Sequence, residues 1–408
     1  MDHAIEVHPW DLAEEGTERA LAQVAALGVQ RISLTAAYPG GRLLRPRAAA
    51  EKLYFPERSV VYYRPDKARW ADSPLGPRGA ELVLVEDYFD TLPIRARREG
   101  MTVEARFVLL PYTPPVAPVV LRRGEPAPIG GRAPHEKLYA RNAFGDDLVG
   151  YLCPSREEVR AYIVRLVDEI TRYDVSSVSI EACGFPAYRV AGIPGAAVLD
   201  GCAAAEFLLG VCFCDACRAR AEAEGIETSP LAWHVRNFVG RMLSGEPGDC
   251  PDIDEGPEAL ADIDGQLPEY VRLRCQTVGS MVSDVRAALR AEVRLVAAAG
   301  SRYPAAGAWR EGCDVERLAE GADEVRLNDG APDAEALLGD LAVAHERAGQ
   351  KAAVSVRLRP GPPWATTYEA FAERVSVARN LGAEGVTFAG YGELALAHLK
   401  WIPRVTGA

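Results

Sequence analysis

The sequence predicts a (β/α)8 barrel, an α/β fold of the TIM-barrel type, with long insertions in its βα loops. Three observations predict this fold. Eight short apolar strands alternate with amphipathic helical patterns, 408 residues suffice for eight such units, and most strands alternate apolar with polar side chains. We therefore expect one domain over residues 1–408. A doubly wound open sheet is the structural alternative, but no glycine-rich phosphate loop follows the first strand.

The expected elements run along the whole chain. Strands are predicted at Ala4–His8, Arg31–Thr35, Val103–Leu109, Ser177–Glu181, Val293–Ala298, Glu324–Asn328, Ala353–Leu358 and Val386–Ala389. Helices are predicted at Leu12–Leu27, Asp87–Glu99, Glu157–Tyr173, Tyr270–Ala291, Val315–Glu320, Ala334–Ala348, Tyr368–Leu381 and Glu393–Lys400. Gly28 and Gly382 follow the first and seventh of these helices, where a glycine commonly ends a helix.

The phase of the strands indicates a polar barrel interior. Apolar residues occupy one phase, for example Ile5 and Val7, and these should pack on the helices. Charged residues occupy the opposite phase, and their burial costs free energy unless they pair or line a solvated pocket. We expect a structural ion network from the lower-layer residues Glu6, Glu104, Arg294 and Arg326. Barrel active sites form at the C-terminal strand ends, which are occupied by His8, Arg106, Glu181, Asn328, Arg357 and Arg359.

Three insertions interrupt the barrel pattern, at residues 38–79, 111–151 and 185–265. The first could hold a small hairpin around residues 59–63, and the third contains a thiol cluster followed by an acidic loop. Long ordered loops in a compact enzyme are usually lids or binding walls. We expect all three to form the wall or lid of the active-site face.

Charge and hydropathy narrow the class of protein. A net charge of −12 disfavours binding to nucleic acid or to an anionic membrane. No apolar run approaches the length of a membrane span, and the N-terminus lacks the pattern of a signal peptide. We therefore expect a cytoplasmic protein that acts on a small molecule, with no organic cofactor. The sequence leaves a homo-oligomer open.

A metal site is predicted from the cysteines. Cys212, Cys214 and Cys217 form a Cys-x-Cys-x2-Cys cluster whose three soft ligands could converge on one tetrahedral ion, usually zinc. Either Cys153 or Cys202 could supply the fourth ligand. Four cysteine ligands leave no open position for catalysis, so the site should be structural. Most of the other cysteines are expected to be small buried apolar residues.

Glu181 is the main catalytic candidate, because it ends an inward-facing phase at a C-terminal strand end. Its structural alternative is an ion pair with Arg106 or Arg357. Asp329 is a candidate second carboxylate, although Asn328-Asp329-Gly330 is also an ordinary turn sequence.

These motifs together resemble the zinc-bearing microbial β-galactosidases. The resemblance rests on the segment from Leu152-Cys153-Pro154 to Tyr162, the strand that ends in Glu181, and the Cys-x-Cys-x2-Cys loop. It implies a (β/α)8 barrel of the retaining glycosidase clan, with zinc on Cys153, Cys212, Cys214 and Cys217 and with Glu181 as acid/base. The chain is also similar to uncharacterised bacterial glycosyl-hydrolase-like proteins. Those proteins have a Leu-Cys-Phe-Cys-x2-Cys segment, whose Cys-Phe-Cys-x2-Cys part matches Cys212 to Cys217 here, and the similarity also rests on residues 388–392 after the last strand.

The sequence departs from the galactosidases at two positions. Ile180 stands where they have Asn before the acid/base, and Arg357 and Arg359 stand where their nucleophilic Glu ends strand seven. Arginines there suggest a substrate with a carboxylate or phosphate, because guanidinium binds planar anions. The aromatic residues Trp10, Tyr38, Tyr112, Trp309, Trp364 and Tyr391 could stack on a sugar.

The sequence therefore predicts a carbohydrate-active, glycoside-hydrolase-like enzyme that acts at a glycosidic carbon, with Glu181 as general acid/base. Its substrate-binding residues are predicted to be His8, Tyr38, Arg106, Asn328, Arg357, Arg359 and Tyr391. One alternative is a sugar-directed lyase, isomerase or transferase, in which Glu181 is a base and arginines hold an acid group. The other alternative is a barrel that only binds a sugar.

Overall fold

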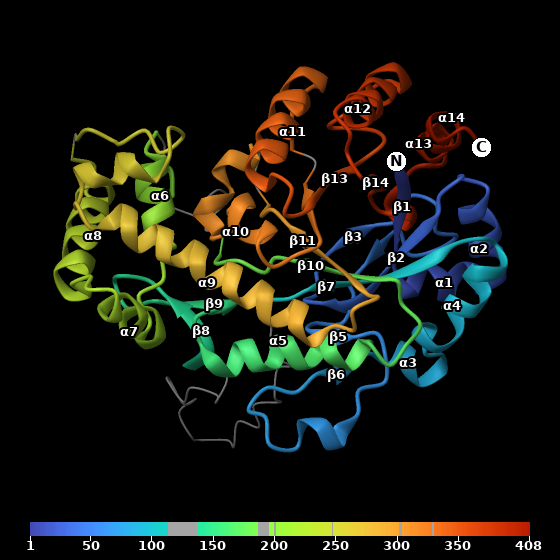
Figure 1. Ribbon diagram of the computed structural model, residues 1–408, viewed down its shortest axis with the longest axis horizontal. Helices are drawn as coiled ribbons and strands as arrows, with labels where there is room; N and C mark the ends of the chain where they lie inside the picture. The colour runs from blue at the N-terminus through green and yellow to red at the C-terminus, as the bar shows by residue number, and fades with distance from the viewer. Residues whose placement is uncertain (113–136, 187–195, 200, 247, 302–303, 329) are drawn as a thin grey trace.

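A closed barrel of parallel strands forms the centre of the molecule (Figure 1). The computed structural model describes residues 1–112, 137–186, 196–199, 201–246, 248–301, 304–328 and 330–408. The barrel strands are β1 (Asp2–Val7), β2 (Arg31–Tyr38), β7 (Thr102–Val108), β10 (Ser177–Glu181), β11 (Arg294–Ala298), β12 (Glu324–Leu327), β13 (Ala353–Leu358) and β14 (Gly385–Phe388). β1 pairs with both β14 and β2, which closes the ring. The predicted barrel is confirmed, and the open-sheet alternative is wrong.

The helices surround the barrel and largely follow the predicted pattern. They are α1 (Pro9–Glu15), α2 (Thr17–Ala25), α4 (Tyr88–Arg98), α5 (Glu157–Ile170), α9 (Leu267–Ala288), α10 (Val315–Ala319), α11 (Ala334–Ala348), α12 (Tyr368–Asn380), α13 (Leu396–Leu399) and α14 (Trp401–Thr406). The single helix predicted over residues 12–27 is wrong, because Gly16 has φ 79° and separates α1 from α2. The helix predicted from Glu393 starts later, and Glu393 belongs to a 3-10 turn, η6 (Tyr391–Glu393).

The barrel interior is polar at its base and contains ion pairs between its strands, as the strand phase predicts. Arg326 donates two hydrogen bonds to Glu104, each 2.9 Å long, and both side chains are at most 1% exposed. Arg294 and Arg326 also form ion pairs with Glu324 at 3.4 and 3.5 Å. The opposite phase, which includes Ile5, has no exposed surface and belongs to the main hydrophobic core. The predicted ion network is therefore present at Glu104, Arg294 and Arg326.

The first insertion builds on the rim of the barrel. β5 (Val60–Val61) pairs antiparallel with β2, and β6 (Arg78–Gly79) pairs with β5. The hairpin expected around residues 59–63 is therefore wrong, since β5 extends the barrel sheet. A two-stranded hairpin lies earlier, between β3 (Leu43–Leu44) and β4 (Leu53–Tyr54). Together with α3 (Leu82–Val85), this insertion encloses a small apolar cluster around Trp10.

The third insertion forms a helical unit beside the barrel (Figure 1). It contains α6 (Ala203–Leu209), α7 (Asp215–Ala223), α8 (Thr228–Leu243) and the 3-10 helix η4 (Pro257–Asp262). Helix α9 joins this unit to the barrel, since Tyr270 packs in the helical cluster and Val285 packs in the barrel core. Helix α9 has 22 residues and packs in both clusters, so it holds the insertion against the barrel wall.

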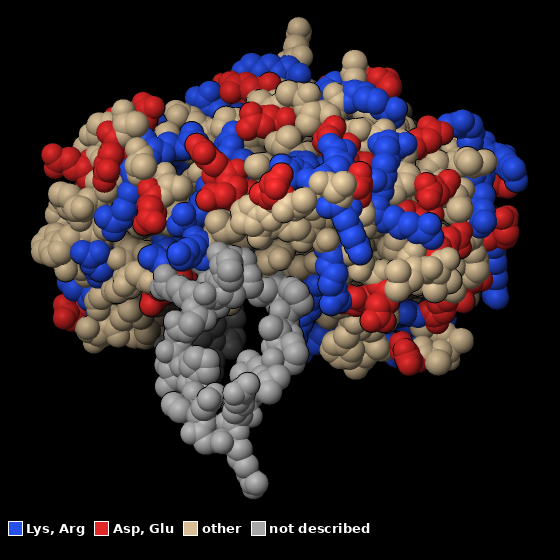
Figure 2. All heavy atoms as spheres, turned by 90° about the horizontal axis from the view of Figure 1, so that it is seen from below, with Lys and Arg blue, Asp and Glu red and all other residues tan. Residues whose placement is uncertain are grey.

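Charged side chains of both signs are interspersed on the face shown in Figure 2. Among the described helices, none combines the length and the apolar character that a membrane span requires.

Candidate active site at the barrel mouth

Glu181 lies where the sequence predicts it, at the C-terminal end of β10. Its Oε2 atom is 3.4 Å from Nη1 of Arg106, which comes from the neighbouring strand β7. Arg106 is 4% exposed, whereas the Glu181 side chain keeps 19% of its surface exposed. One oxygen of Glu181 therefore contacts Arg106, and the carboxylate is otherwise partly exposed to solvent. This arrangement leaves a carboxylate oxygen available for proton transfer.

The backbone turns sharply after Glu181. Ala182 has φ 48°, in the left-handed region that residues with a side chain rarely adopt. A side chain on Gly184 would place its Cβ 2.2 Å from the carbonyl oxygen of Glu311, so only glycine fits there. Phe185 N then donates to the same carbonyl at 2.6 Å, which ties this loop to the segment after β11.

Glu6 is held inside the mouth by two arginines. Arg357 donates from Nε and Nη2 at 2.5 and 2.8 Å, and Arg106 lies 3.4 Å from Oε2. Burial would raise the pKa of the Glu6 carboxyl, but Arg106 and Arg357 outweigh it and lower that pKa to about 2. The Glu6 side chain is only 1% exposed. Glu6 is therefore a fixed counter-charge within the site, and its partners are these mouth arginines.

Glu393 is a further carboxylate at the mouth that the sequence analysis did not identify. Arg359 Nη1 donates to its Oε2 atom at 3.0 Å, and His8 Nε2 lies 3.4 Å from its Oε1 atom. The Glu393 side chain is 21% exposed. Its position five residues after the last strand is the sequence signal for a residue at the mouth, but the pattern of residues 393–400 predicts the start of a helix there.

Close packing at Gly392 fixes the position of Glu393. A Cβ on Gly392 would lie 2.0 Å from Oδ1 of Asp11, which is buried at the start of α1. The other carboxylate oxygen of Asp11 accepts a hydrogen bond from the His8 backbone at 3.0 Å. The first and last strands of the barrel are thus linked at the point where His8 and Glu393 meet.

Tyr38 lies near the charged groups of the mouth. Burial raises the pKa of its phenol; the Arg106 charge opposes this, while Glu393, Glu181 and Glu6 raise the pKa further. Tyr38 is half-buried at the end of β2, with its ring edge toward His8.

The remaining predicted site residues are Asn328, Asp329 and Tyr391. Asn328 is partly buried, and its Nδ2 atom donates to the carbonyl oxygen of Gly300, whereas Asp329 lies outside the described residues. Tyr391 has no exposed surface, and its hydroxyl group bonds to Glu15 and Gln23 at 2.7 and 2.8 Å. The interpretation of Tyr391 as a sugar contact is therefore corrected, because the ring is covered and its hydroxyl contacts α1 and α2.

The predicted cysteine cluster is assembled between the segment after β9 (Asp147–Leu152) and the start of α7. The Sγ atoms of Cys153, Cys212, Cys214 and Cys217 all lie within 4.8 Å of one another, and all four residues are buried. Cys153 Sγ is 3.8, 3.6 and 3.6 Å from those of Cys212, Cys214 and Cys217. A tetrahedral zinc ion with Zn–S bonds of about 2.3 Å requires S···S distances of about 3.8 Å. The four thiols therefore fit such an ion.

Cys202, the alternative fourth ligand, forms a disulfide with Cys250. This pairing was not predicted, and it removes Cys202 from the metal site. The disulfide joins the start of α6 to the acidic loop of the third insertion. Cys153 therefore completes the cluster from the segment after β9 (Asp147–Leu152).

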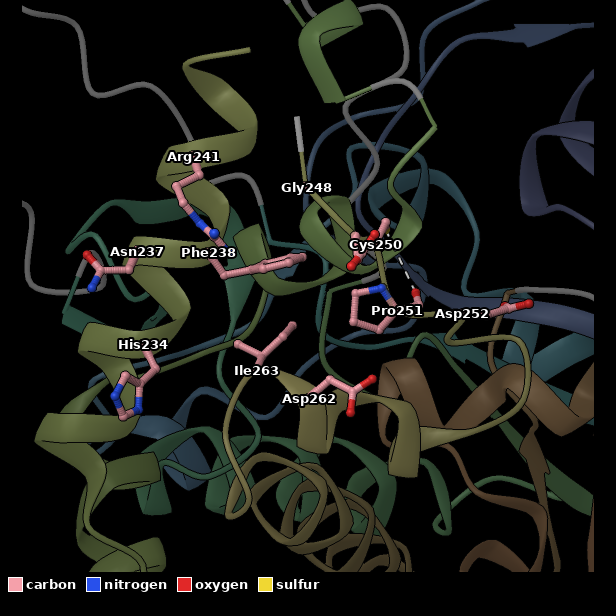
Figure 3. A pocket seen from close by; sticks show the side chains of 11 residues that line it. His234, Asn237, Phe238, Arg241, Gly248, Cys250, Pro251, Asp252, Asp262 and Ile263 are labelled. Carbon is pink, nitrogen blue, oxygen red and sulfur yellow. Dashed lines mark hydrogen bonds between the residues drawn. The ribbon is translucent and has the colours of Figure 1, made fainter. Parts of the chain in front are cut away.

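A cavity of 990 Å³ lies in the helical insertion, away from the barrel mouth (Figure 3). One wall is the face of α8 that carries His234, Phe238 and Arg241, and the opposite wall includes Pro251 and Asp262. His234 pairs with Asp264 at the end of this insertion. We place the candidate active site at the barrel mouth, because the mouth brings the partly exposed carboxylates of Glu181 and Glu393 into contact with the guanidinium groups of Arg106 and Arg359.

The (β/α)8 barrel of this chain is a fold that solved glycoside hydrolase structures also have. Two solved structures of that class resemble the chain, and both are β-galactosidases. That of the psychrophilic Marinomonas ef1 has 12% sequence identity and a TM-score of 0.54, and that of Bacillus circulans sp. alkalophilus has 13% and 0.53. The alignments cover 100% of this chain but 59% and 55% of the galactosidase chains. The chain thus spans a little over half of their length.

Similarity at this level of identity establishes the fold. No protein-family model matches the sequence, and none of the curated proteins matches it.

Proposed function

We propose that this protein is a glycoside-hydrolase-like enzyme that acts on a neutral glycoside, with Glu181 as the general acid/base. The observation that carries the proposal is the position of Glu181, at a C-terminal strand end with one oxygen near Arg106 and the rest of the carboxylate partly exposed. The barrel fold, which the β-galactosidases share, supports the same class of reaction.

Charge pairing at the mouth favours a neutral substrate. Arg357 is bound by Glu6, Arg359 is bound by Glu393, and Arg106 lies between Glu6 and Glu181. Each guanidinium therefore already has a carboxylate partner inside the protein. A substrate anion would have to displace one of these partners, which would leave a carboxylate unpaired at a mostly buried position. The anionic substrate expected from the sequence, and the lyase alternative that depends on it, are thus disfavoured.

The cysteine cluster is proposed to hold a structural zinc ion. Its four thiolates would fill the coordination sphere, so the ion would supply no open position for chemistry. Cys217 stands in the first turn of α7, and Cys153 lies beside the end of β9. Zinc would therefore fix the helical insertion to the wall of the mouth.

A panel of neutral aryl glycosides tests the proposed reaction, with an aryl glucuronide as the anionic comparison. We expect the wild type to hydrolyse at least one neutral glycoside, and Glu181→Gln to lower its kcat by about 10²–10⁴-fold. Glu99→Gln is the matched control, because Glu99 is exposed at the end of α4. The reaction assignment fails if Glu181→Gln matches the wild type in kcat. A barrel that only binds sugars would show affinity without turnover in both proteins.

A further inference from the structure

Two carboxylates at the mouth keep exposed surface, Glu181 and Glu393, and a chain of polar contacts joins them. Glu181 contacts Arg106 at 3.4 Å, and Arg106 Nη2 donates to Thr35 Oγ1 at 3.0 Å. Thr35 Oγ1 is 2.9 Å from His8 Nδ1, and His8 Nε2 is 3.4 Å from Glu393. The orientation of one carboxylate is thus coupled to that of the other through three buried side chains.

The donors in this chain determine the tautomer of His8. A guanidinium group can only donate, so Thr35 Oγ1 must accept from Arg106. Thr35 Oγ1 has a second lone pair and one proton, so its contact with His8 Nδ1 at 2.9 Å can run in either direction. An ionised Glu393 carboxylate can only accept, so its contact with Nε2 requires a ring proton on that atom, and Nδ1 of a neutral ring then accepts the proton of Thr35.

Packing holds the His8 ring in this orientation. The ring stacks on Trp10 with centroids 4.1 Å apart and planes 12° apart. His8 is 2% exposed and Trp10 is 3% exposed, so neither side chain has surface for a ligand. His8 can therefore act on the reaction only through Glu393, and the expectation that it contacts substrate is replaced by this indirect role.

We propose that Glu393 is the second catalytic carboxylate of the mouth, and that His8, with a ring proton on Nε2 toward Glu393, is its positioning residue. This assignment rests on the proposed glycoside hydrolysis. Burial opposes ionisation of Glu393, but hydrogen bonds from His8 and Arg359 hold the pKa of its carboxyl well below the usual range. An ionised second carboxylate is what this reaction requires.

The bond between the anomeric carbon and the glycosidic oxygen breaks, its electron pair stays on that oxygen, and Glu181 supplies the proton. In one route, Glu393 forms a bond to the anomeric carbon as the glycosidic bond breaks; water then displaces Glu393, and the proton that water loses passes to Glu181. In the other route, the water oxygen bonds to the anomeric carbon directly and Glu393 takes the water proton; exchange with solvent then removes that proton from Glu393 and returns one to Glu181. The anomer of the first-formed product separates these two routes.

Turnover by four variants tests the assignment. We expect Glu393→Gln to lower kcat by at least 100-fold on the glycoside that the wild type hydrolyses. His8→Gln can keep a donor near the position of Nε2, whereas His8→Asn places its amide near Nδ1, so we expect His8→Gln to retain at least tenfold more kcat than His8→Asn. Thr35→Val should lower kcat by about tenfold or more with little change in KM. Circular dichroism and thermal unfolding check that each variant folds.

Nitrogen NMR of histidine-labelled protein reads the tautomer directly and does not depend on turnover. The chain has six histidines, and the His8→Gln spectrum identifies the signals of His8 by their loss. We expect wild-type His8 to carry a ring proton on Nε2. A ring whose one proton is on Nδ1 would overturn the positioning role.

The outcomes distinguish this inference from the proposed function. An active wild type together with an equally active Glu393→Gln would overturn the assignment of Glu393 alone. A wild type that turns over no glycoside would overturn the proposed function, and the catalytic role of Glu393 with it. Equal kcat values for His8→Gln and His8→Asn would remove the argument that the Nε2 proton matters.

Discussion

Glu6 and Glu181 are both glutamates of the barrel interior, but their surroundings give them different roles. Both oxygens of Glu6 are occupied by guanidinium groups, and the side chain has almost no exposed surface. Glu181 shares only one of these partners, Arg106, and is partly exposed. The alternation of apolar and polar residues predicts that both side chains point into the barrel. It does not predict which arginine each carboxylate contacts, because these arginines come from strands far apart in the sequence.

Tyr391 illustrates the same limit. Its position after the last strand suggested a sugar contact, but the neighbouring glycines turn its side chain toward α1 and α2. The same turn brings Glu393 to the mouth. A sequence pattern cannot show the direction of such a turn, because the direction depends on the close contact between Gly392 and Asp11.

Removal of the Tyr391 hydroxyl should affect stability alone. We expect Tyr391→Phe to lower the free energy of unfolding by about 1.5–3 kcal/mol, because the hydroxyl bonds to the Glu15 carboxylate and to Gln23. Activity per folded molecule should remain unchanged. Urea unfolding combined with steady-state kinetics checks both expectations, and a raised KM with normal stability would restore the role as a sugar contact.

At the scale of the secondary-structure elements, the strands could be predicted because their alternation is a local property of the sequence. All eight barrel strands were identified, with most ends within two residues. The positions of the insertions could be predicted, but the secondary structure and the disulfide within them could not. The β3–β4 hairpin and the disulfide between Cys202 and Cys250 depend on residues that meet only in the folded chain.

The ion pair between β7 and β12 gives an element-scale prediction. Glu104→Gln should destabilise the protein by about 3–5 kcal/mol, because it leaves the buried Arg326 guanidinium without its bidentate partner. The double variant Glu104→Met with Arg326→Met should have a free energy of unfolding closer to that of the wild type. Each side chain that loses a partner keeps another, because Glu324 still pairs with Arg294, and Arg31, which also pairs with Glu104, still pairs with Asp2. Equal losses in the two proteins would contradict this account. Denaturant unfolding measures both.

The cysteine cluster gives a second element-scale prediction. Metal analysis of the purified protein should find one zinc ion per chain, and Cys217→Ser should lose it together with thermal stability. Cys275→Ser is the matched control, because Cys275 is buried outside the cluster and should leave the zinc content unchanged. Retention of zinc by Cys217→Ser would exclude the cluster as the metal site.

At the scale of the whole molecule, the mouth carboxylates should make folding sensitive to acid. The pKa of Glu6 is lowered from 4.5 to about 2 in the folded state, so its contribution is present above the unfolded pKa and is lost as the pH falls toward 2. The lowered pKa values of Glu104 and Glu393 act in the same direction. We expect the free energy of unfolding to fall steadily from about pH 5 to pH 2. A free energy of unfolding that stays constant or rises as the pH falls over this range would contradict the ion pairing of these carboxylates.

One measurement tests the central claim directly: a crystal structure with a neutral disaccharide whose glycosidic oxygen is replaced by sulfur. We predict that the ligand lies in the barrel mouth, with its linkage atom next to Glu181 and its anomeric carbon facing Glu393. The separation of the two carboxylates would then indicate the stereochemical course, about 5 Å for retention and about 6.5–9.5 Å for inversion. A ligand in the cavity beside α8, with Glu181 still facing only Arg106, would contradict the account.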